Sequence, residues 1–301
     1  MPDFSAPAGK VVVVGDSRPG DYLEFFLEDS RHVPKIVFEA IAAERPSCVV
    51  HAGDIAVYGA HASFWQGWRG WDRDVAPLAA AGIPVYPALG NHEYRGFTRD
   101  PLSHYFARFA HLGGRLYYTL LSGARLFVFL DSNFDRLGGE KAAAQDRWLS
   151  GVLERARVES AVRHVIPVVH HPPFTNVSRR YLVFESREVQ RRWVPAFLDH
   201  PKVAMVVSGH VHAYEHIVEG GKRFIVTGGG GSPRFRLRTR GARLRRDLWP
   251  GREALRPFHY LRLEDEPSGA SRVEVVCWRP GGGWYVGDAF TLDAASAAGA
   301  S

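Results

Sequence analysis

Five short polar motifs between residues 15 and 212 carry the side chains that could do chemistry. They are Gly15-Asp16, Gly53-Asp54, Gly90-Asn91-His92-Glu93, His170-His171-Pro172 and Gly209-His210-Val211-His212. Aspartate, asparagine and histidine without cysteine form a donor set suited to Mn, Fe or Zn. Two metal ions about 3.5–4 Å apart need a bridging carboxylate and further ligands that leave positions open for water and substrate. The residue types therefore predict a catalytic centre with one or two metal ions.

Each motif alone carries little information. A Gly-Asp pair is a common turn, and His170-His171 could cap a strand end through hydrogen bonds to the backbone. The spacing of His210 and His212 places both side chains on one face of an extended segment, yet such a pair is more often structural than metal-binding. The prediction therefore depends on the five motifs occurring together, each at a strand end.

The elements that must position these motifs follow from the hydrophobic pattern. Short β-branched runs alternate with amphipathic stretches, which predicts strands linked by helices. We expect strands at 10–14, 47–51, 83–88, 116–121, 125–131, 163–170 and 203–208, and helices at 33–44, 61–75, 101–110, 140–157 and 184–199. All five motifs follow a predicted strand, and open α/β sheets place their binding crevices at such strand ends.

After residue 208 the pattern changes to strands without intervening helices, at 213–218, 223–227, 259–264, 272–278 and 284–286. These read as antiparallel or mixed pairings. Because candidate ligands come from both halves, we predict one catalytic domain over residues 1–291 with two packed sheets, and a disordered tail over residues 292–301. The four glycines at 228–231 predict a loop, since glycine loses much backbone entropy in a regular element.

A basic loop over residues 234–256 contains nine arginines. Our preferred interpretation is a solvated, mobile surface loop; the alternative is an electropositive lip for an anionic substrate.

Composition narrows the class of protein. The chain has 301 residues, 46% of them hydrophobic, and a formal charge of +6, which argues against a disordered protein and slightly favours anionic partners. Cys48 and Cys277 each lie in an apolar run and read as reduced core thiols. No secretory signal or membrane-spanning run is recognised, so we expect a cytoplasmic protein without a membrane partner.

The five motifs together resemble the signature of the calcineurin-like metallophosphoesterase superfamily, GD, GD, GNH[DE], HxP and GHxH. Gly209 to Glu215 followed by the glycine-rich loop looks like the purple acid phosphatase branch. The resemblance implies an α/β fold, a four-layer α/β/β/α sandwich of two mixed sheets with the metals at the sheet edge.

The resemblance also implies roles for individual residues. Asp16 and His212 would bind the first metal ion, Asp54 would bridge, and Asn91, His170 and His210 would bind the second. His92 would contact the phosphate and assist the leaving group, so that His92 and Asp54 are the expected catalytic residues. His170 satisfies the His-x-Pro spacing with Pro172, which leaves His171 as a neighbouring residue that could bind substrate.

Two positions depart from these patterns. Most of the superfamily has a histidine two residues after the first aspartate, and that residue is Arg18 here. Purple acid phosphatases replace that ligand with a tyrosine three residues after the second aspartate, and that residue is Val57 here, with Tyr58 one position later. Tyr58 could reach the first ion if the loop bulges, and the first site is expected to be weak. A guanidinium near a metal ion is unfavourable unless an anion lies between them, so we expect Arg18 to bind the substrate phosphate.

The expected function is hydrolysis of phosphate esters, as a phosphomonoesterase or phosphodiesterase, by attack of a metal-bound hydroxide. The expected substrate is a phosphorylated small molecule. Two alternatives are a metallophosphoesterase-like scaffold without catalysis, and a nuclease that uses the same site with the arginine-rich loop as a clamp.

Overall fold

The fold is built on two mixed β-sheets. The computed structural model describes residues 2–20, 24, 26–63, 67–241 and 244–293. The first sheet has the order β1-β5-β6-β7-β8-β10-β9, with bounds β1 (Phe4–Ala6), β5 (Tyr118–Ser122), β6 (Arg125–Leu130), β7 (His164–Val169), β8 (Met205–Ser208), β10 (Lys222–Thr227) and β9 (Tyr214–Glu219). The second has the order β13-β12-β11-β2-β3-β4, with bounds β13 (Gly283–Leu292), β12 (Ser271–Arg279), β11 (Phe258–Asp265), β2 (Val11–Val14), β3 (Cys48–His51) and β4 (Val85–Pro87).

Parallel pairing places the functional strand ends at common edges. In the seven-stranded sheet β6, β7, β8 and β10 run parallel, and in the six-stranded sheet β2, β3 and β4 run parallel. The pairs β11–β12, β12–β13 and β11–β2 are antiparallel. The carboxyl ends of β2, β3 and β4 therefore lie together, as do those of β7 and β8.

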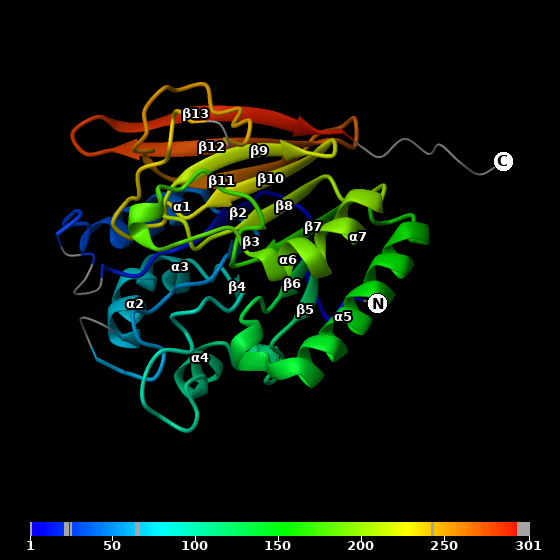
Figure 1. The fold of residues 1–301 in the computed structure, drawn as a ribbon, viewed down its shortest axis with the longest axis horizontal. Helices are drawn as coiled ribbons and strands as arrows, with labels where there is room; N and C mark the ends of the chain where they lie inside the picture. Colours follow the sequence, from blue (N-terminus) through cyan, green and yellow to red (C-terminus); the bar gives the residue numbers. More distant parts are fainter. Residues whose placement is uncertain (1, 21–23, 25, 64–66, 242–243, 294–301) are drawn as a thin grey trace.

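Helices cover the outer faces of the two sheets. Figure 1 shows α1, α2 and α3 together on one side and α5, α6 and α7 together on the other. The helix bounds are α1 (Val33–Glu44), α2 (Trp68–Asp74), α3 (Ala76–Ala80), α4 (Ser103–Arg108), α5 (Phe134–Val158), α6 (Arg187–Arg192) and α7 (Val194–Asp199), with short 3₁₀ turns at η1 (Ala110–Leu112) and η2 (Arg179–Tyr181).

Alternation along β6 shows how the layers are held. Leu126 and Val128 pack in the apolar cluster formed with α5, α6 and α7, whereas Phe127 and Phe129 pack in the cluster that contains β2 and β3. Successive side chains of a strand point to opposite faces, so the seven-stranded sheet separates a helical layer from the other sheet. The predicted four-layer α/β/β/α sandwich is confirmed.

Several predicted elements differ from those observed. The helix expected at 61–75 begins only at Trp68; residues 61–63 are not helical, and 64–66 lie outside the described residues. The helix expected at 184–199 is two helices, because Pro195 cannot donate a backbone hydrogen bond and instead stands at the start of α7. The long helix α5 begins at Phe134 and is interrupted at Gly138, whose φ of 72° is not helical.

The predicted tail begins too early. Leu292, the first residue of the predicted tail, is the last residue of β13 and is buried, so it is ordered. Residues 294–301, where the rest of this prediction falls, lie outside the described residues.

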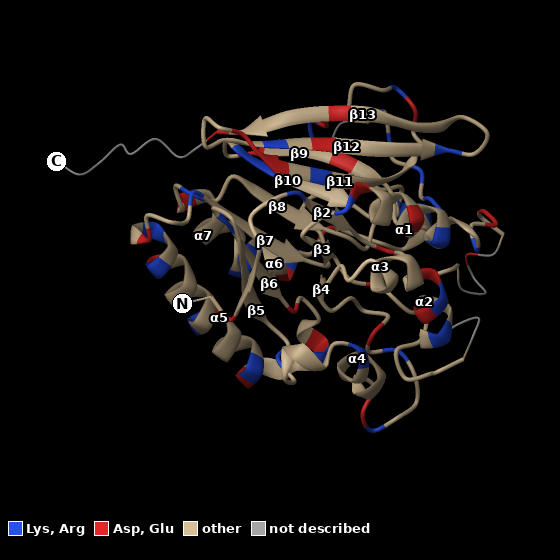
Figure 2. Ribbon diagram, turned by 180° about the vertical axis from the view of Figure 1, so that it is seen from behind, with Lys and Arg blue, Asp and Glu red and all other residues tan. Residues whose placement is uncertain are grey.

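The described parts of the arginine-rich segment, residues 234–241 and 244–256, are held against the rest of the molecule at several points; the mobility predicted for the loop stays a prediction. Arg234 pairs with Glu28, Arg245 with Glu185 and Glu219, and Arg256 with Asp247. The side chains of Phe235, Leu237 and Trp249 in the same segment are buried. Figure 2 shows Lys and Arg interspersed with Asp and Glu along the chain. The segment is thus held by ion pairs and by burial of its own apolar residues.

In the part of the chain that the structure describes, no helix combines the length and apolar character that crossing a membrane requires.

Candidate metal centre

The six predicted metal ligands come from strand ends of both sheets and meet at one place. Asp16, Asp54 and Asn91 follow β2, β3 and β4 of the six-stranded sheet. His170, His210 and His212 follow β7 and β8 of the seven-stranded sheet. Loops from the two sheets are hydrogen-bonded to each other, for example the amide of Gly230 to the carbonyl of Gly15 at 2.9 Å.

Asp54 lies at the centre of this group and is almost fully buried, with 1% exposure. Its Oδ1 is 3.2 Å from Nε2 of His170 and accepts a hydrogen bond of 3.0 Å from the amide of His92. Its Oδ2 is 3.5 Å from Nε of Arg18 and 3.7 Å from Nε2 of His92. A carboxylate with neighbours on both oxygens is positioned as a bridging ligand needs to be.

Asp16 and His212 lie on one side of Asp54. The Asp16 carboxylate accepts hydrogen bonds from the amide of His210 at 2.9 and 3.0 Å, and its Oδ1 is 3.6 Å from Nε2 of His212. Donor atoms of Asp16, Asp54 and His212 all lie within 4.8 Å of one another.

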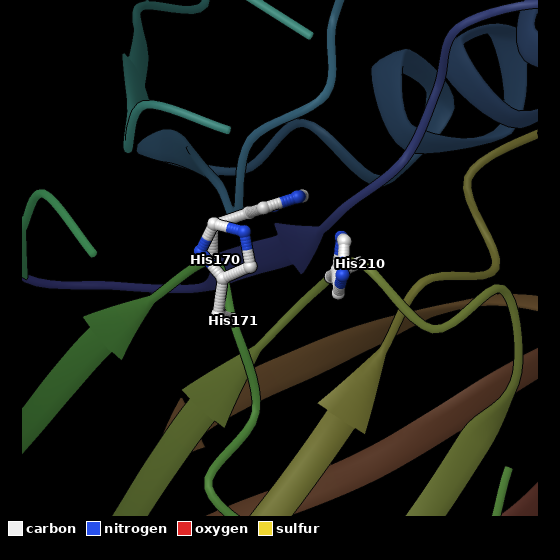
Figure 3. A group of neighbouring side chains, drawn as sticks. All are labelled: His170, His171 and His210. Carbon is white, nitrogen blue, oxygen red and sulfur yellow. The ribbon is translucent and has the colours of Figure 1, made fainter. Parts of the chain in front are cut away.

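Asn91, His170 and His210 lie on the other side. Oδ1 of Asn91 is 3.1 Å from Nε2 of His170, and the rings of His170 and His210 are 5.0 Å apart between centroids. His171 joins this group, with its ring 4.5 Å from that of His210 and Nδ1 2.8 Å from Oγ of Ser132. Figure 3 shows His170, His171 and His210 gathered from two neighbouring strand ends. Their donor atoms also lie within 4.8 Å of one another.

Backbone carbonyls fix the orientation of three histidine rings. Nδ1 of His170 is 2.8 Å from the carbonyl of Ala52, Nδ1 of His212 is 2.8 Å from that of Pro233, and Nδ1 of His92 is 2.7 Å from that of Val57. A carbonyl can only accept, so each Nδ1 carries the proton, and in a neutral ring Nε2 keeps its lone pair. A backbone partner of this kind is typical of metal-ligating histidines.

The backbone is strained at three of the ligands. Asp16, Asp54 and His210 have φ values of 56°, 58° and 68°, in the left-handed region that non-glycine residues seldom adopt. Such conformations persist only where surrounding structure imposes them, and they cluster at functional sites. The strain turns the three side chains off their strands toward one another.

Two glycines of the motifs serve different purposes. Gly53 has a φ of 94°, which requires glycine for conformational reasons. At Gly209 the reason is space, because an added Cβ would lie 2.6 Å from Oδ2 of Asp16 and 2.9 Å from the carbonyl oxygen of Ala52. Neighbouring ligand loops can approach only because this position has no side chain.

Burial and charge set the protonation of the site. Burial lowers the pKa of His212 to about 4 and that of His210 well below its usual range, so both rings are neutral at pH 7. Burial also acts to lower the pKa of His170, but the neighbouring charge of Asp54 outweighs it and raises that pKa to about 9. Burial raises the pKa of Asp16 well above normal, whereas His170 holds that of Asp54 well below normal against the effect of burial. Two buried carboxylates this close together favour a cation between them.

The donor chemistry fits metal ions. Asp54, Asn91, His170 and His210 offer two oxygens and two imidazole nitrogens, and Asp16 and His212 add one carboxylate and one imidazole. Imidazoles, carboxylates and an amide oxygen suit Mn, Fe or Zn, and an ion bound at His170 would have to displace the proton that Asp54 favours there. The metal identity stays a prediction.

Arg18 and Tyr58 are the two residues whose roles were predicted from departures from the family motifs. Arg18 is buried beside Asp54, and its two Nη atoms form ion-paired hydrogen bonds of 2.5 and 2.9 Å with Glu24. Tyr58 packs its ring 5.7 Å from that of His61 and lines a cavity next to the site. Their predicted roles, phosphate binding for Arg18 and metal binding for Tyr58, stay predictions.

Glu93 has a role that the sequence analysis did not assign. Its carboxylate accepts hydrogen bonds from the amides of Gly90 at 2.7 Å, Asp54 at 2.9 Å, Ile55 at 2.8 Å and Ala56 at 3.3 Å. Burial and the charge of Asp54 raise its pKa to about 7. Glu93 thereby ties the loop after β3 to the loop after β4. Its place in the Gly90-Asn91-His92-Glu93 motif was the available signal.

Comparison with known proteins agrees with this geometry. Residues 9–214 match the family model described as calcineurin-like phosphoesterase. Purple acid phosphatase 23 of Arabidopsis thaliana is 32% identical over 158 residues, which are 50% of this chain and 32% of that protein. Probable inactive purple acid phosphatase 9 of the same plant is 25% identical over 209 residues, 59% of this chain and 31% of that protein. The chain thus spans about a third of the length of these relatives.

One solved structure shares the fold over nearly the whole chain. GAP50, described as the anchor in the inner membrane complex of Plasmodium, superposes with a TM-score of 0.70 at 17% identity, covering 95% of this chain and 88% of that one. At this identity the likeness concerns the fold alone.

Proposed function

The chain belongs to the calcineurin-like phosphoesterase family, and from this premise we propose that it is an enzyme that hydrolyses phosphate esters with the help of metal ions. The observation that carries the proposal is the meeting of Asp54 with ligands from both sheets, at 3.2 Å from His170 and within 4.8 Å of donor atoms of Asp16 and His212. Separate loops converge on one buried carboxylate, which a structural role alone does not require.

The residues present form two adjoining candidate ligand sets that share Asp54, and metal would be held in one or both of them. Asp16 and His212 complete the first set, and Asn91, His170 and His210 complete the second. Bound ions supply two kinds of chemistry in such a site: they lower the pKa of water toward neutrality and neutralise charge on phosphoryl oxygens. The backbone carbonyls of Ala52 and Pro233 hold Nδ1 of His170 and His212, so that Nε2 of each ring would be the atom that binds an ion.

His92 is positioned to act on the substrate. Val57 fixes its Nδ1, and its Nε2 lies 3.7 Å from Oδ2 of Asp54, which puts the free ring nitrogen at the edge of the ligand group. Burial lowers the pKa of His92 well below its usual range, and the charge of Arg18 acts in the same direction, so the ring is neutral at pH 7. Nδ1 holds the proton of the neutral ring, so Nε2 can accept a hydrogen bond or a proton, and it could assist a leaving group only after taking up a proton there.

A cavity of about 680 Å³ next to His92 suits the organic part of a small phosphorylated substrate. Its lining includes the aromatic side chains of Tyr58, Tyr94 and Phe97 and the guanidinium groups of Arg95 and Arg136. Nη1 of Arg95 is 3.2 Å from Nδ1 of His92, so the cavity adjoins the site. Aromatic and cationic walls favour a flat or anionic substituent on the ester.

The test combines metal analysis with turnover. Chain purified with added Mn²⁺ is analysed for bound metal and assayed on chromogenic phosphate monoesters, diesters and cyclic phosphates. We expect metal-dependent hydrolysis of at least one class, abolished by chelation and restored by Mn²⁺. Metal-loaded chain that hydrolyses none of them would contradict the proposal.

A scaffold without catalysis is the second candidate. It is favoured by the replacement of one superfamily ligand by Arg18 and by the relative whose name describes it as probably inactive. The same assay separates the two functions, since a scaffold predicts folded protein and no turnover in any metal.

A nuclease is less well supported, because carboxylates already pair with Arg234, Arg245 and Arg256 of the arginine-rich segment. The proposed partner is therefore a phosphorylated small molecule rather than a nucleic acid or a membrane.

We also propose a cytoplasmic location, supported by Cys48 and Cys277, which are buried free thiols of the kind that a reducing compartment maintains.

A further inference from the structure

Arg18 occupies the side of the site where the first metal ion would bind. The side chain is 2% exposed, and its backbone amide donates to the carbonyl of Asp54 at 3.3 Å. Burial alone would lower the pKa of this guanidinium, but the charges of Glu24 and Asp54 outweigh burial and raise that pKa. The guanidinium is therefore permanently positive. A fixed cation is thus buried among the ligands.

The guanidinium lies against two of the atoms that the first metal ion would need. Nη2 of Arg18 is 3.4 Å from Nε2 of His212, and because Nδ1 of His212 donates to Pro233, Nε2 is the acceptor in this contact. Nε of Arg18 is 3.5 Å from Oδ2 of Asp54, the carboxylate oxygen on the side away from His170. A divalent ion bound to these two atoms would lie against a positive charge.

Glu24 holds the guanidinium in this position. Its two carboxylate oxygens accept from Nη1 at 2.5 Å and from Nη2 at 2.9 Å, a bidentate arrangement that fixes the plane of the group. Nη1 also donates to the carbonyl of Pro19 at 3.2 Å. Glu24 is therefore a positioning residue for Arg18.

The other members of the second ligand set lie by Oδ1 of Asp54, whereas this cation lies by Oδ2. His170 lies between Asn91 and Asp54, with Nε2 at 3.1 and 3.2 Å from their oxygens, and its ring is next to that of His210. Donor atoms of Asn91, Asp54 and His170 meet there with His210 beside His170, whereas the first set has three donors and faces Arg18.

We infer that Arg18 takes the place of the first metal ion, so that the chain binds one ion, at Asp54, Asn91, His170 and His210, and the guanidinium supplies the second positive charge. This inference rests on the proposed function, but metal stoichiometry tests it separately from turnover. It replaces the two-ion site that the resemblance implies with a site of one ion and one arginine.

Metal stoichiometry tests the inference directly. Chain reconstituted with Mn²⁺, freed of excess metal and analysed by mass spectrometry should contain one ion per chain. Arg18→His removes the cation and adds a ligand, and it should contain two. Arg31→His, at an exposed arginine that also pairs with a carboxylate, is the matched control and should contain one. Asn91→Ala should lose the single ion.

A second variant guards against misfolding of Arg18→His. Arg18→Gln removes the charge without adding a ligand, and calorimetric titration with Mn²⁺ should show a second binding step with a dissociation constant at least tenfold lower than in the unaltered chain. Circular dichroism and the melting temperature check the fold of each variant.

Two tightly held ions in the unaltered chain would overturn the inference, as would a single ion that survives Asn91→Ala but is lost in Asp16→Asn. Turnover measured on the same samples keeps the two proposals apart. One ion without turnover would contradict the proposed function alone, and two ions with turnover would contradict this inference alone.

Discussion

At the scale of single residues, the side chain of Asp54 can be separated from its backbone. Asparagine tolerates the left-handed conformation about as well as aspartate does, so Asp54→Asn should keep the loop while removing the negative charge at the centre of the ligand group. Loss of a residue that only orients a metal ligand typically reduces activity 10–100-fold, so loss of a ligand should reduce kcat by more than about 100-fold. Assays on a chromogenic ester with Mn²⁺ measure the effect.

The control for this variant is Asp72→Asn, which removes a carboxylate paired with Arg108 at the surface. It should retain full turnover. His210→Ala should behave like Asp54→Asn, and a folded variant of either kind with unchanged kcat would remove that residue from the site.

Glu93 gives a prediction for stability. Glutamine has one acceptor oxygen, and its amide group would face backbone donors that the carboxylate now satisfies. Leaving a buried donor without an acceptor costs about 1–3 kcal/mol, so Glu93→Gln should lower the free energy of unfolding by at least that amount. Urea denaturation compares it with Glu154→Gln, at an exposed position on α5. Equal stability of the two variants would show that the hydrogen bonds of Glu93 contribute little.

The candidate ligands were predictable from sequence because each follows an apolar β-branched run that reads as a buried strand. The pairing of Arg18 with Glu24 was not, because both residues lie outside regular elements and no periodicity brings them together. The need for glycine at position 209 could not be predicted either, because it is a matter of space and depends on the approach of Asp16 from the other sheet.

At the scale of elements, α1 lies at the residues where the local sequence pattern predicts a helix. Pro34 stands at its start, and Arg45, in a left-handed conformation, follows its end. Pattern did not reveal β1, which is three residues long and pairs with β5, more than a hundred positions away. The pairing of β11 with β2, which joins the end of the chain to its first long strand, is equally distant. The sequence around each strand gives no indication of which distant strand it pairs with.

A pH dependence belongs to the contact between β9 and the loop after β7. Glu215 of β9 accepts hydrogen bonds from Oγ1 of Thr175 and, at 2.6 Å, from the amide of Asn176, and burial raises its pKa to about 8. A carboxyl group whose pKa is higher in the folded than in the unfolded state binds its proton more tightly when folded. Stability from this group is therefore full below about pH 4.5 and is lost as the pH rises toward 8.

Glu215→Gln cannot titrate and removes this dependence. The free energy of unfolding of the unaltered chain, measured relative to that of the variant, should fall between pH 5 and pH 8 by up to about 1.4 kcal/mol per pH unit. Chemical denaturation at several pH values measures the difference. A constant difference across this range would mean that Glu215 is ionised in the folded protein.

At the scale of the whole molecule, the distribution of charge predicts a weak response to salt. Basic and acidic residues are interspersed (Figure 2), and ion pairs hold much of the arginine-rich segment. The KM for a small phosphate ester should therefore change less than about twofold between 50 and 200 mM NaCl. A protein that makes 6–10 contacts to nucleic-acid phosphates loses about 10³–10⁵ in affinity over that range, and such a loss with single-stranded DNA would favour the nuclease.

The ligands that bind the proposed ion are divided between the two sheets, Asp54 and Asn91 on one and His170 and His210 on the other. A cation held by all four would cross-link the halves of the sandwich, much as a disulfide joins distant segments. At a free metal concentration about 100 times the dissociation constant, this linkage adds about 2.7 kcal/mol to the free energy of unfolding. Treatment with EDTA should accordingly lower the melting temperature of the entire molecule and hasten its digestion by protease, whereas an ion bound by one sheet alone would leave the other sheet free to open.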